Sequence, residues 1–364
     1  MWLWCKGRGR SVRKHFHEHS HESNAELEIC MATAMTSLKH VLVFVALGLA
    51  LSGGLFSLGA GRPGQAALTG AVSGLNFNPL QVALLRWYPA NLTTKFTVGT
   101  KPQCLAFDGA NIWVANDGSN TVTKLQASTG QLLGTFSVGN TPYGVAFDGA
   151  NVWVSNARSN NIMKLRASDG KLLGTFAVGV VPLGIAFDGS NVWVTNTGSN
   201  NVTKLRARDG AVLGTFPVGI NPDAVAFDGV NLWVANTADN TVTELTENGE
   251  VLRVISVGGY PSGLAFDGSS MWVANLNTND VTKIRVSDGA VLGTFPVGQA
   301  PPGLAFDGKY IWVANALSNN VMKLDPQTGR VLGTFPESLG PNFVAFDGAN
   351  IWVTNYNSGT VSKL

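Results

Sequence analysis

The feature that most constrains this chain is one eleven-residue stretch that recurs seven times. AFDGANIWVAN, at 106–116, returns with small changes at intervals of 40, 40, 40, 39, 40 and 40 residues. A fixed period of this length is typical of repeat architectures, in which each copy builds one supersecondary unit. Glycine and asparagine interrupt every copy, so no segment is long enough for the paired amphipathic helices of an α-solenoid. The period therefore indicates the blades of a β-propeller.

Each repeat is interpreted as four short strands joined by tight turns. In the first copy we expect strands over 103–107, 112–116, 121–127 and 132–139, with an Asp-Gly turn between the first two. The second strand is apolar on both faces, as a strand between two packed sheets must be. The fourth strand contains proline in three copies, which fits an outer edge because proline donates no ladder hydrogen bond.

The two ends of the repeat region complement each other. The seventh copy stops after its third strand, while KFTVG at 95–99 matches TFSVG at 135–139, the fourth strand of the first copy. The early strand can supply the one that is missing at the end, which leaves no unpaired sheet edge in the ring. We therefore predict an all-β, seven-bladed β-propeller of four-stranded antiparallel blades over 92–364, closed by an N-terminal strand that completes the last blade.

The residues before the propeller form three further segments. Residues 1–40 are expected to be an N-terminal extension that is disordered or comes from an over-extended start. Residues 41–66 read as a signal peptide or a membrane anchor, because 41–61 carry no charge and small residues follow them. Residues 67–91 read as a linker. Either interpretation of 41–66 puts the repeats outside the cytoplasm, as a secreted, periplasmic or cell-surface protein or one anchored in the membrane.

Charge and cysteine content exclude several classes of function. The formal net charge is +2, and the 25 Lys and Arg are dispersed, so we expect no nucleic-acid partner. Cys104 is the one cysteine within the repeats, which leaves no disulfide framework or zinc pattern there. We interpret Cys104 as a small apolar residue at the start of a strand. No cofactor and no metal site are expected.

The polar residues that recur in every copy are interpreted as scaffold. Asp-Gly is a preferred hairpin turn, and an aspartate there bonds its own turn. The loop between the second and third strands ends in an asparagine in six copies and in Gly359 in the seventh. Asparagine and glycine both tolerate a positive φ, so this position is interpreted as having a backbone role. All five histidines precede residue 41, so the propeller has no Ser-His-Asp or Cys-His arrangement.

The repeat resembles a known family. The patterns WVAN-x-x-SN-x-V-x-K-L and G-x-x-x-GTF-x-VG-x-x-P-x-G-x-AFDG, over about 92–364, resemble the YVTN-type β-propeller repeat. That resemblance implies a relation to NHL-type propellers and to secreted and surface-layer proteins. A more distant resemblance is to the virginiamycin B lyase family, whose seven-bladed members open a cyclic peptide antibiotic with a histidine base and a magnesium ion. Because the propeller has no histidine, that base has no counterpart here.

Function is expected where the copies differ, in the loops at one end of the channel. The variable residues there form a candidate ligand-binding rim: Lys101, Gln103, Asp117, Tyr143, Arg158, Asn221, Asp223, Tyr260, Asn277, Asn342 and Tyr356. We expect a monomeric, non-catalytic binding or scaffold module that recognises a protein, a glycan or a small ligand. The alternatives are a metal-assisted lyase or lactonase, a purely structural surface-layer element, and ordinary loop drift without function.

Overall fold

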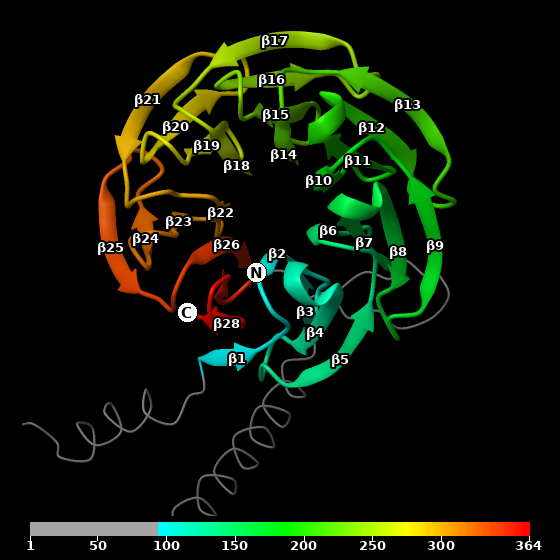
Figure 1. The fold of residues 1–364 in the computed structure, drawn as a ribbon. Helices are drawn as coiled ribbons and strands as arrows, with labels where there is room; N and C mark the ends of the chain where they lie inside the picture. The colour runs from blue at the N-terminus through cyan, green and yellow to red at the C-terminus, as the bar shows by residue number, and fades with distance from the viewer. Residues whose placement is uncertain (1–93) are drawn as a thin grey trace, which may run out of the picture. The chain divides into compact units, whose positions relative to one another are not determined.

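The computed structural model describes residues 94–364, which form a ring of seven four-stranded antiparallel sheets (Figure 1). The predicted seven-bladed propeller is confirmed. The segments 1–40, 41–66 and 67–91 lie outside the described residues, and so do the expectations about them. Within 94–364, no helix is long and apolar enough to cross a membrane.

Two strands of each blade lie nearest the channel. The innermost strands are β2 (Pro102–Phe107), β6 (Pro142–Phe147), β10 (Pro182–Phe187), β14 (Pro222–Phe227), β18 (Pro261–Phe266), β22 (Leu304–Phe306) and β26 (Pro341–Phe346). The second strands are β3 (Asn111–Asn116), β7 (Asn151–Asn156), β11 (Asn191–Asn196), β15 (Leu232–Asn236), β19 (Ser270–Asn275), β23 (Ile311–Asn315) and β27 (Ile351–Asn355). The innermost strand of the sixth blade, β22, is short because two prolines, which donate no ladder hydrogen bond, precede it.

Two further strands complete each blade toward the outside. The third strands are β4 (Thr121–Gln126), β8 (Asn161–Arg166), β12 (Asn201–Arg206), β16 (Thr241–Leu245), β20 (Asp280–Arg285), β24 (Asn320–Leu324) and β28 (Thr360–Lys363). The outermost strands are β1 (Lys95–Thr97), β5 (Leu132–Ser137), β9 (Leu172–Ala177), β13 (Val212–Pro217), β17 (Val251–Ser256), β21 (Val291–Pro296) and β25 (Val331–Pro336). Pro217, Pro296 and Pro336 end outermost strands, as the sequence predicts.

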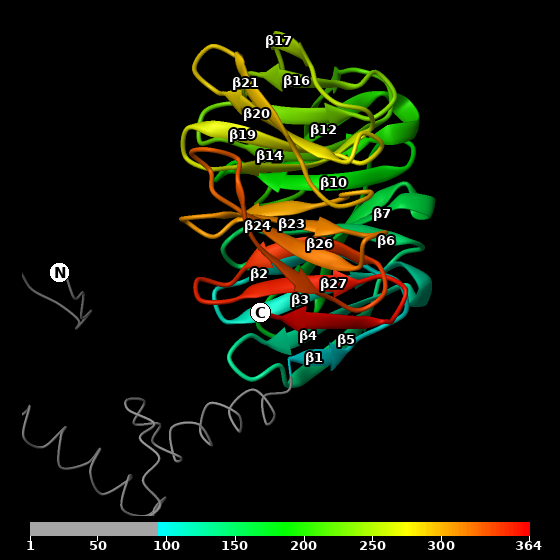
Figure 2. The same ribbon diagram turned by 90° about the vertical axis from the view of Figure 1, so that its left-hand side faces the viewer.

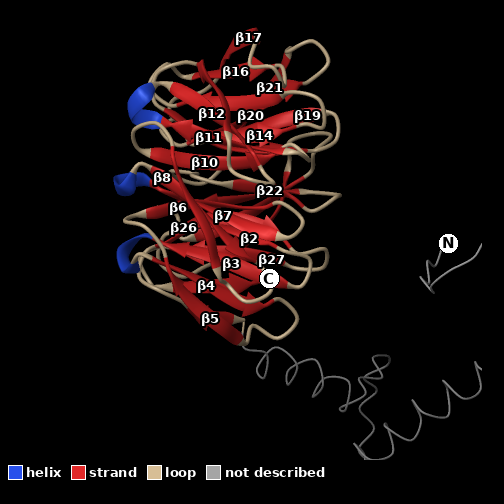
Figure 3. Ribbon diagram, turned by 90° about the vertical axis from the view of Figure 1, so that its right-hand side faces the viewer, coloured by secondary structure: helices blue, strands red, loops and turns tan. Residues whose placement is uncertain are grey.

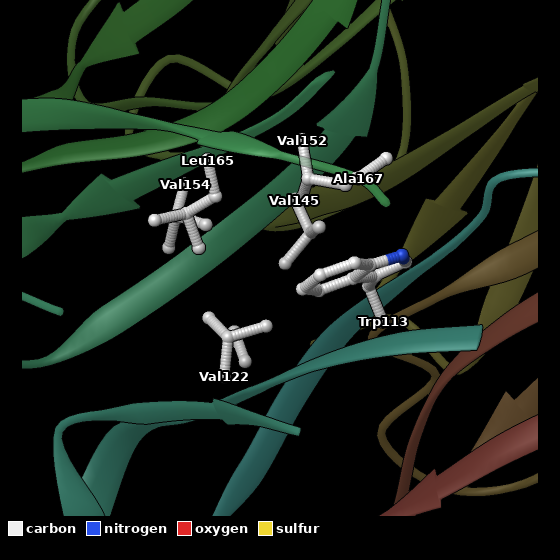
Figure 4. Packing of buried hydrophobic residues seen from close by; sticks show 8 residues of the cluster. Trp113, Val122, Val145, Val152, Val154, Leu165 and Ala167 are labelled. Carbon is white, nitrogen blue, oxygen red and sulfur yellow. The ribbon is translucent and has the colours of Figure 1, made fainter. Parts of the chain in front are cut away.

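The hydrophobic core lies between neighbouring blades. One cluster combines Trp113 and Val122 of the first blade with Val152, Val154 and other residues of the second (Figure 4). Both faces of each second strand are buried because a neighbouring blade packs on either side; Trp113 and Val114 are 0% exposed. This packing explains why the second strand carries apolar residues on both of its faces.

A lysine on the third strand joins most blades to the next one. Lys124 Nζ lies 5.1 Å from the centre of the Trp113 ring and donates a 2.6 Å hydrogen bond to the carbonyl of Ala167 in the following blade. Equivalent bonds to the next blade come from Lys164, Lys204, Lys283 and Lys363. Each bond gives the lysine ammonium at the edge of the core a hydrogen-bond acceptor. It also stabilises the contact between blades, because a hydrogen bond from a charged donor is stronger than one from a neutral donor.

The fourth blade replaces this lysine with an ion pair. Glu244 holds the lysine position, is 0% exposed, and lies 3.0 Å from Nη1 of Arg253, which stands opposite it on β17. The Arg253 guanidinium donates to the carbonyls of Val286 and Ser287 in the fifth blade. The two residues together therefore make the contact that a single lysine makes elsewhere. Glycine faces that lysine in its own blade, for example Gly134 opposite Lys124.

The ring closes in the seventh blade as the sequence predicts. β1 pairs antiparallel with β28, with Phe96 opposite Val361, so the first and last described strands lie side by side (Figure 2). The Phe96 ring lies 5.5 Å from that of Trp352, a contact that Phe136 makes with Trp113 in the first blade at the same distance. The early strand thus supplies both the edge pairing and the aromatic contact of the last blade.

The loops between second and third strands gather at one end of the ring. Three of them contain a single 3-10 turn, η1 (Asp117–Ser119), η2 (Ala157–Ser159) and η3 (Thr197–Ser199), and these turns lie on one face of the ring (Figure 3). The segments that link one blade to the next meet the loops there, since Asp117 and Gly118 donate to the carbonyls of Lys101 and Thr100. We call this the loop end of the propeller.

In six of the seven blades, an asparagine side chain connects the loop of the blade to the linker that leads to the next blade. Asn120 has the predicted positive φ, 56°, and its Oδ1 also accepts a 2.9 Å hydrogen bond from the Thr141 amide. The same bond recurs from Asn160, Asn200, Asn240, Asn279 and Asn319. The residue has a side-chain role in addition to the predicted backbone role, and Gly359 in the seventh blade cannot make this bond.

Candidate functional site

The seven recurring aspartates are structural, as the sequence indicates. Asp108 Oδ1 accepts hydrogen bonds from the amides of Ala110 and Asn111, and Oδ2 accepts one of 2.7 Å from the Trp113 indole. Desolvation disfavours the charged form, but these hydrogen bonds outweigh it and hold the pKa of Asp108 below its ordinary value. The indole bond, which the sequence does not reveal, locks each buried tryptophan to its turn.

Three stacked rings of residues line the channel, and each blade gives every ring one residue that lies in its innermost strand or, in the sixth blade, in the strand or directly before it. The ring nearest the loop end, which we call the mouth ring, contains seven different residues: Gln103, Tyr143, Leu183, Asp223, Ser262, Pro302 and Asn342. The next ring is small apart from Cys104 and Phe343. The third ring is apolar throughout: Leu105, Val145, Ile185, Val225, Leu264, Leu304 and Val344. Polarity thus falls along the channel from the loop end inward.

A cavity of about 420 Å³ opens above the mouth ring, and we call it the mouth cavity. The whole mouth ring lines it, together with residues from the loops and linkers of the fifth, sixth and seventh blades: Tyr260, Leu276, Ala316, Leu317, Gly340, Tyr356 and Asn357. An inner cavity of about 200 Å³ continues it into the channel. Tyr143 and Asp223 line both cavities.

The structure brings together six of the eleven rim residues predicted from sequence. Gln103, Tyr143, Asp223, Tyr260, Asn342 and Tyr356 line the mouth cavity. The other five do not line it: Lys101, Asp117, Arg158, Asn221 and Asn277. Lys101 remains close, because its Nζ lies 5.8 Å from the centre of the Tyr356 ring.

Asp223 is the most unusual polar side chain in the cavity. It is 7% exposed, and its Oδ1 has no hydrogen-bond partner. Desolvation raises the pKa of Asp223 to about 7, against a smaller opposite effect of a hydrogen bond from the Tyr143 hydroxyl. A buried carboxylate that no cation neutralises is costly in a folded protein. Asp223 is therefore poised to receive a ligand group that donates a hydrogen bond or carries positive charge.

Two neighbours of Asp223 are held in their neutral forms. Burial, with the Asp223 carboxyl as a second cause, raises the pKa of the Cys104 thiol well above its ordinary value. Burial and Asp223 likewise raise the pKa of Tyr143. Because the thiolate is the nucleophilic form of cysteine, Cys104 is in an environment that suppresses nucleophilic chemistry.

Several residues of the mouth cavity were not predicted from the sequence. Leu183, Ser262 and Pro302 belong to the mouth ring but are not aromatic, charged or amide side chains. The sequence does contain a signal that could have found them. Each innermost strand begins with a proline or, in the sixth blade, follows one, and the residue after that first proline differs in all seven copies. Leu276 can be found in the same way, from the loops between second and third strands.

A larger depression at the opposite end of the propeller has less to offer a ligand. It measures about 640 Å³ and lies between the second and third blades, lined by Lys164, Arg206 and neighbouring residues. Lys164 already donates to the Ala207 carbonyl, and Arg206 pairs with Asp209. Within residues 94–364, no three His, Cys, Asp or Glu side chains converge into a group that could hold a metal ion.

Comparison with known proteins shows the fold. The chain is structurally similar to virginiamycin B lyase. The enzyme from Staphylococcus aureus matches with a TM-score of 0.64 and 17% identity, over 74% of this chain and 97% of that one. Hydrazine synthase of Kuenenia stuttgartiensis matches with a TM-score of 0.64 and 20% identity, over 75% and 96%. A streptogramin B lyase matches with a TM-score of 0.64 and 18% identity, over 74% and 95%. No family model and no curated protein matches the sequence.

Proposed function

We propose that this protein is a non-catalytic binding module that takes a small ligand in the mouth cavity. The observation that carries the proposal is the mouth ring, in which seven different side chains surround one cavity on a frame that otherwise repeats. A ligand site typically combines apolar walls with a few polar groups that fix orientation. Here Leu183, Leu276 and Leu317 supply apolar wall, and Gln103, Asp223 and Asn342 supply polar groups.

A binding role fits the chemistry of the cavity better than catalysis. The propeller has no histidine, Cys104 is held as a thiol, and Asn342 Nδ2 already donates a 2.6 Å hydrogen bond to Gln103 Oε1. This last bond crosses from the seventh blade to the first and fixes one side of the mouth ring. We also infer from the sequence pattern that the repeats are of YVTN type and act outside the cytoplasm.

The proposal is tested by ligand-observed NMR on the purified full-length chain. A panel of small probes of different charge, namely choline, acetate, phenol and glucose, is screened at millimolar concentration. We expect saturation transfer to at least one probe, and we expect the Tyr260→Ala variant to lose it, because Tyr260 is a 42% exposed wall of the cavity. Tyr310→Ala, which removes a tyrosine outside the cavity, is the matched control. If no probe binds, or if both variants behave alike, the proposed function is wrong.

A further inference from the structure

The mouth cavity contains an unneutralised acidic group. Asp223 Oδ1 is buried and unpartnered, and the ion pairs within residues 94–364 do not include Asp223. In the other blades the same position carries no charge, so the acid is a local addition to the repeat. The Asp223 main chain is held independently, because its carbonyl accepts a 2.6 Å hydrogen bond from Thr195 Oγ1. The scaffold therefore fixes the Asp223 main chain and leaves the carboxyl Oδ1 without a partner.

Aromatic side chains line the same cavities as this acid. Tyr143, Tyr260 and Tyr356 line the mouth cavity, and Phe343 lies just below in the inner cavity. The Tyr143 and Phe343 rings meet edge to face, with centroids 5.8 Å apart. Aromatic faces attract cations, most strongly where the cation is desolvated. Three tyrosines and one carboxylate in a single cavity favour a ligand that is positively charged and also apolar.

The remaining wall distinguishes an organic cation from a metal ion. A hard divalent ion requires several oxygen ligands, and within 94–364 no cluster of three acidic or sulfur- or imidazole-bearing side chains exists to supply them. Leu183, Leu276 and Leu317 line the same cavity as Asp223. A hydrated ion would lose water against these leucines without gaining a replacement ligand, which is unfavourable, whereas methyl groups pack well against them.

We propose that the mouth cavity recognises an alkylated ammonium group, with the positive charge beside the Asp223 carboxylate and the methyl groups against the tyrosines and leucines. This inference rests on the proposed function, because it names the ligand class for the same site. The Lys101 ammonium lies near the Tyr356 ring, but Lys101 is outside the cavity lining. Within residues 94–364 no Lys or Arg side chain lies over the Tyr143 or the Tyr260 ring, so no protein cation competes with a ligand for these two rings.

The test compares two probes of the same shape that differ in charge. Choline and 3,3-dimethylbutan-1-ol, in which carbon replaces the nitrogen, are titrated against the full-length chain and followed by calorimetry and NMR. We expect choline to bind at least about tenfold more tightly at pH 8, since a tenfold ratio corresponds to about 1.4 kcal/mol. Equal affinity for the two probes would overturn the inference.

Two aspartate variants assign that preference to the site. Asp223→Asn keeps the shape and removes the charge, so the tenfold preference for choline should disappear. Asp239→Asn is the matched control: Asp239 is exposed, belongs to the loop end of the same blade, and accepts from the Ile220 amide, which an asparagine oxygen also does. Retained preference in Asp223→Asn would overturn the inference. If choline fails to bind while acetate, phenol or glucose binds, the ligand class is wrong and the proposed function stands.

Discussion

At the scale of single residues, Asp223 departs most from the repeat. The equivalent position in the other six blades holds an uncharged residue. Desolvation in the folded protein raises the pKa of Asp223 to about 7. For an acid whose pKa is raised in the folded state, the folded protein holds the proton more tightly than the unfolded chain. The contribution of Asp223 to stability is therefore complete below its unfolded pKa near 4, and it is lost as the pH rises toward 7.

This sign leads to a prediction for Asp223→Asn without ligand. At pH 8 the variant should be more stable than the native chain, by at most about 4 kcal/mol, since the folded pKa lies near 7 and a tenfold change in proton affinity corresponds to about 1.4 kcal/mol. At pH 4 most of the difference should be gone, because the carboxyl is then neutral in the folded protein and about half protonated in the unfolded chain. Urea unfolding at pH 4, 6 and 8 measures this, with Asp239→Asn as control. A pH-independent difference would contradict the prediction.

Single residues also mark the limit of what the sequence could predict about the site. Gln103, Tyr143, Asp223 and Asn342 could be selected because they are polar or aromatic where copies differ. Leu183 and Pro302 were missed because an apolar deviation resembles drift. Asn221 and Tyr260 hold the same linker position, both with positive φ, yet only the longer Tyr260 side chain lines the cavity. Whether a linker side chain extends into the cavity depends on its length and on how it packs. Aligning the repeats gives no information about that packing.

At the scale of the element, the blades were predictable because each strand follows a local rule. A second strand that is apolar on both faces, Asp-Gly turns and edge prolines set the strand order, and all three act within one repeat. The contacts between blades were less predictable. The lysine of β4 could be seen to recur, but that its Nζ donates across to Ala167, 43 positions later, depends on how neighbouring sheets pack. The fourth blade shows that the contact matters more than the residue, since Glu244 and Arg253 reproduce it jointly.

The fourth blade yields a prediction about compensating substitutions. Arg253→Gly should destabilise the protein by about 3–5 kcal/mol, because it leaves the Glu244 carboxylate buried without its partner. Adding Glu244→Lys should recover most of the loss, since the double variant restores the lysine-and-glycine pair of the other blades, such as Lys124 and Gly134. Urea unfolding measures both variants.

The control for this pair is Glu244→Lys alone. It places a second positive charge beside Arg253 in a buried position, so it should be less stable than the double variant. If the two substitutions simply add, the inter-blade contact does not depend on the pairing and the interpretation of the fourth blade is wrong.

At the scale of the whole molecule, closure depends on the shortest outermost strand. β1 has three residues, whereas the other outermost strands have six. Phe96 compensates by packing against Trp352, as Phe136 packs against Trp113. In the seventh blade, however, β28 and β1 belong to opposite ends of the described chain, so no turn holds them together. Noncovalent contacts alone keep this blade complete.

This difference predicts unequal effects of two equivalent substitutions. Phe96→Ala and Phe136→Ala remove the same ring from the same kind of contact. Phe96→Ala should accelerate amide exchange throughout β1 and β28, because the unlinked strand can then detach. Phe136→Ala should leave β5 paired with β4, because a tight turn still joins them. Hydrogen–deuterium exchange with peptide resolution distinguishes the two results, and equal protection in both variants would refute closure by an independent strand.

The closing strand has a mechanical consequence as well. The chain enters the ring at β1, so any pull on residues 1–93 reaches the propeller first through three residue pairs between β1 and β28. If the mouth cavity holds a ligand that is attached to an immobile partner, a pulling force on residues 1–93 acts between that ligand and β1. The opposing resistance comes mainly from the Phe96 ring and this short ladder. The joint that completes the ring would then be the first to yield under tension, with the other six blades and their covalent turns intact behind it.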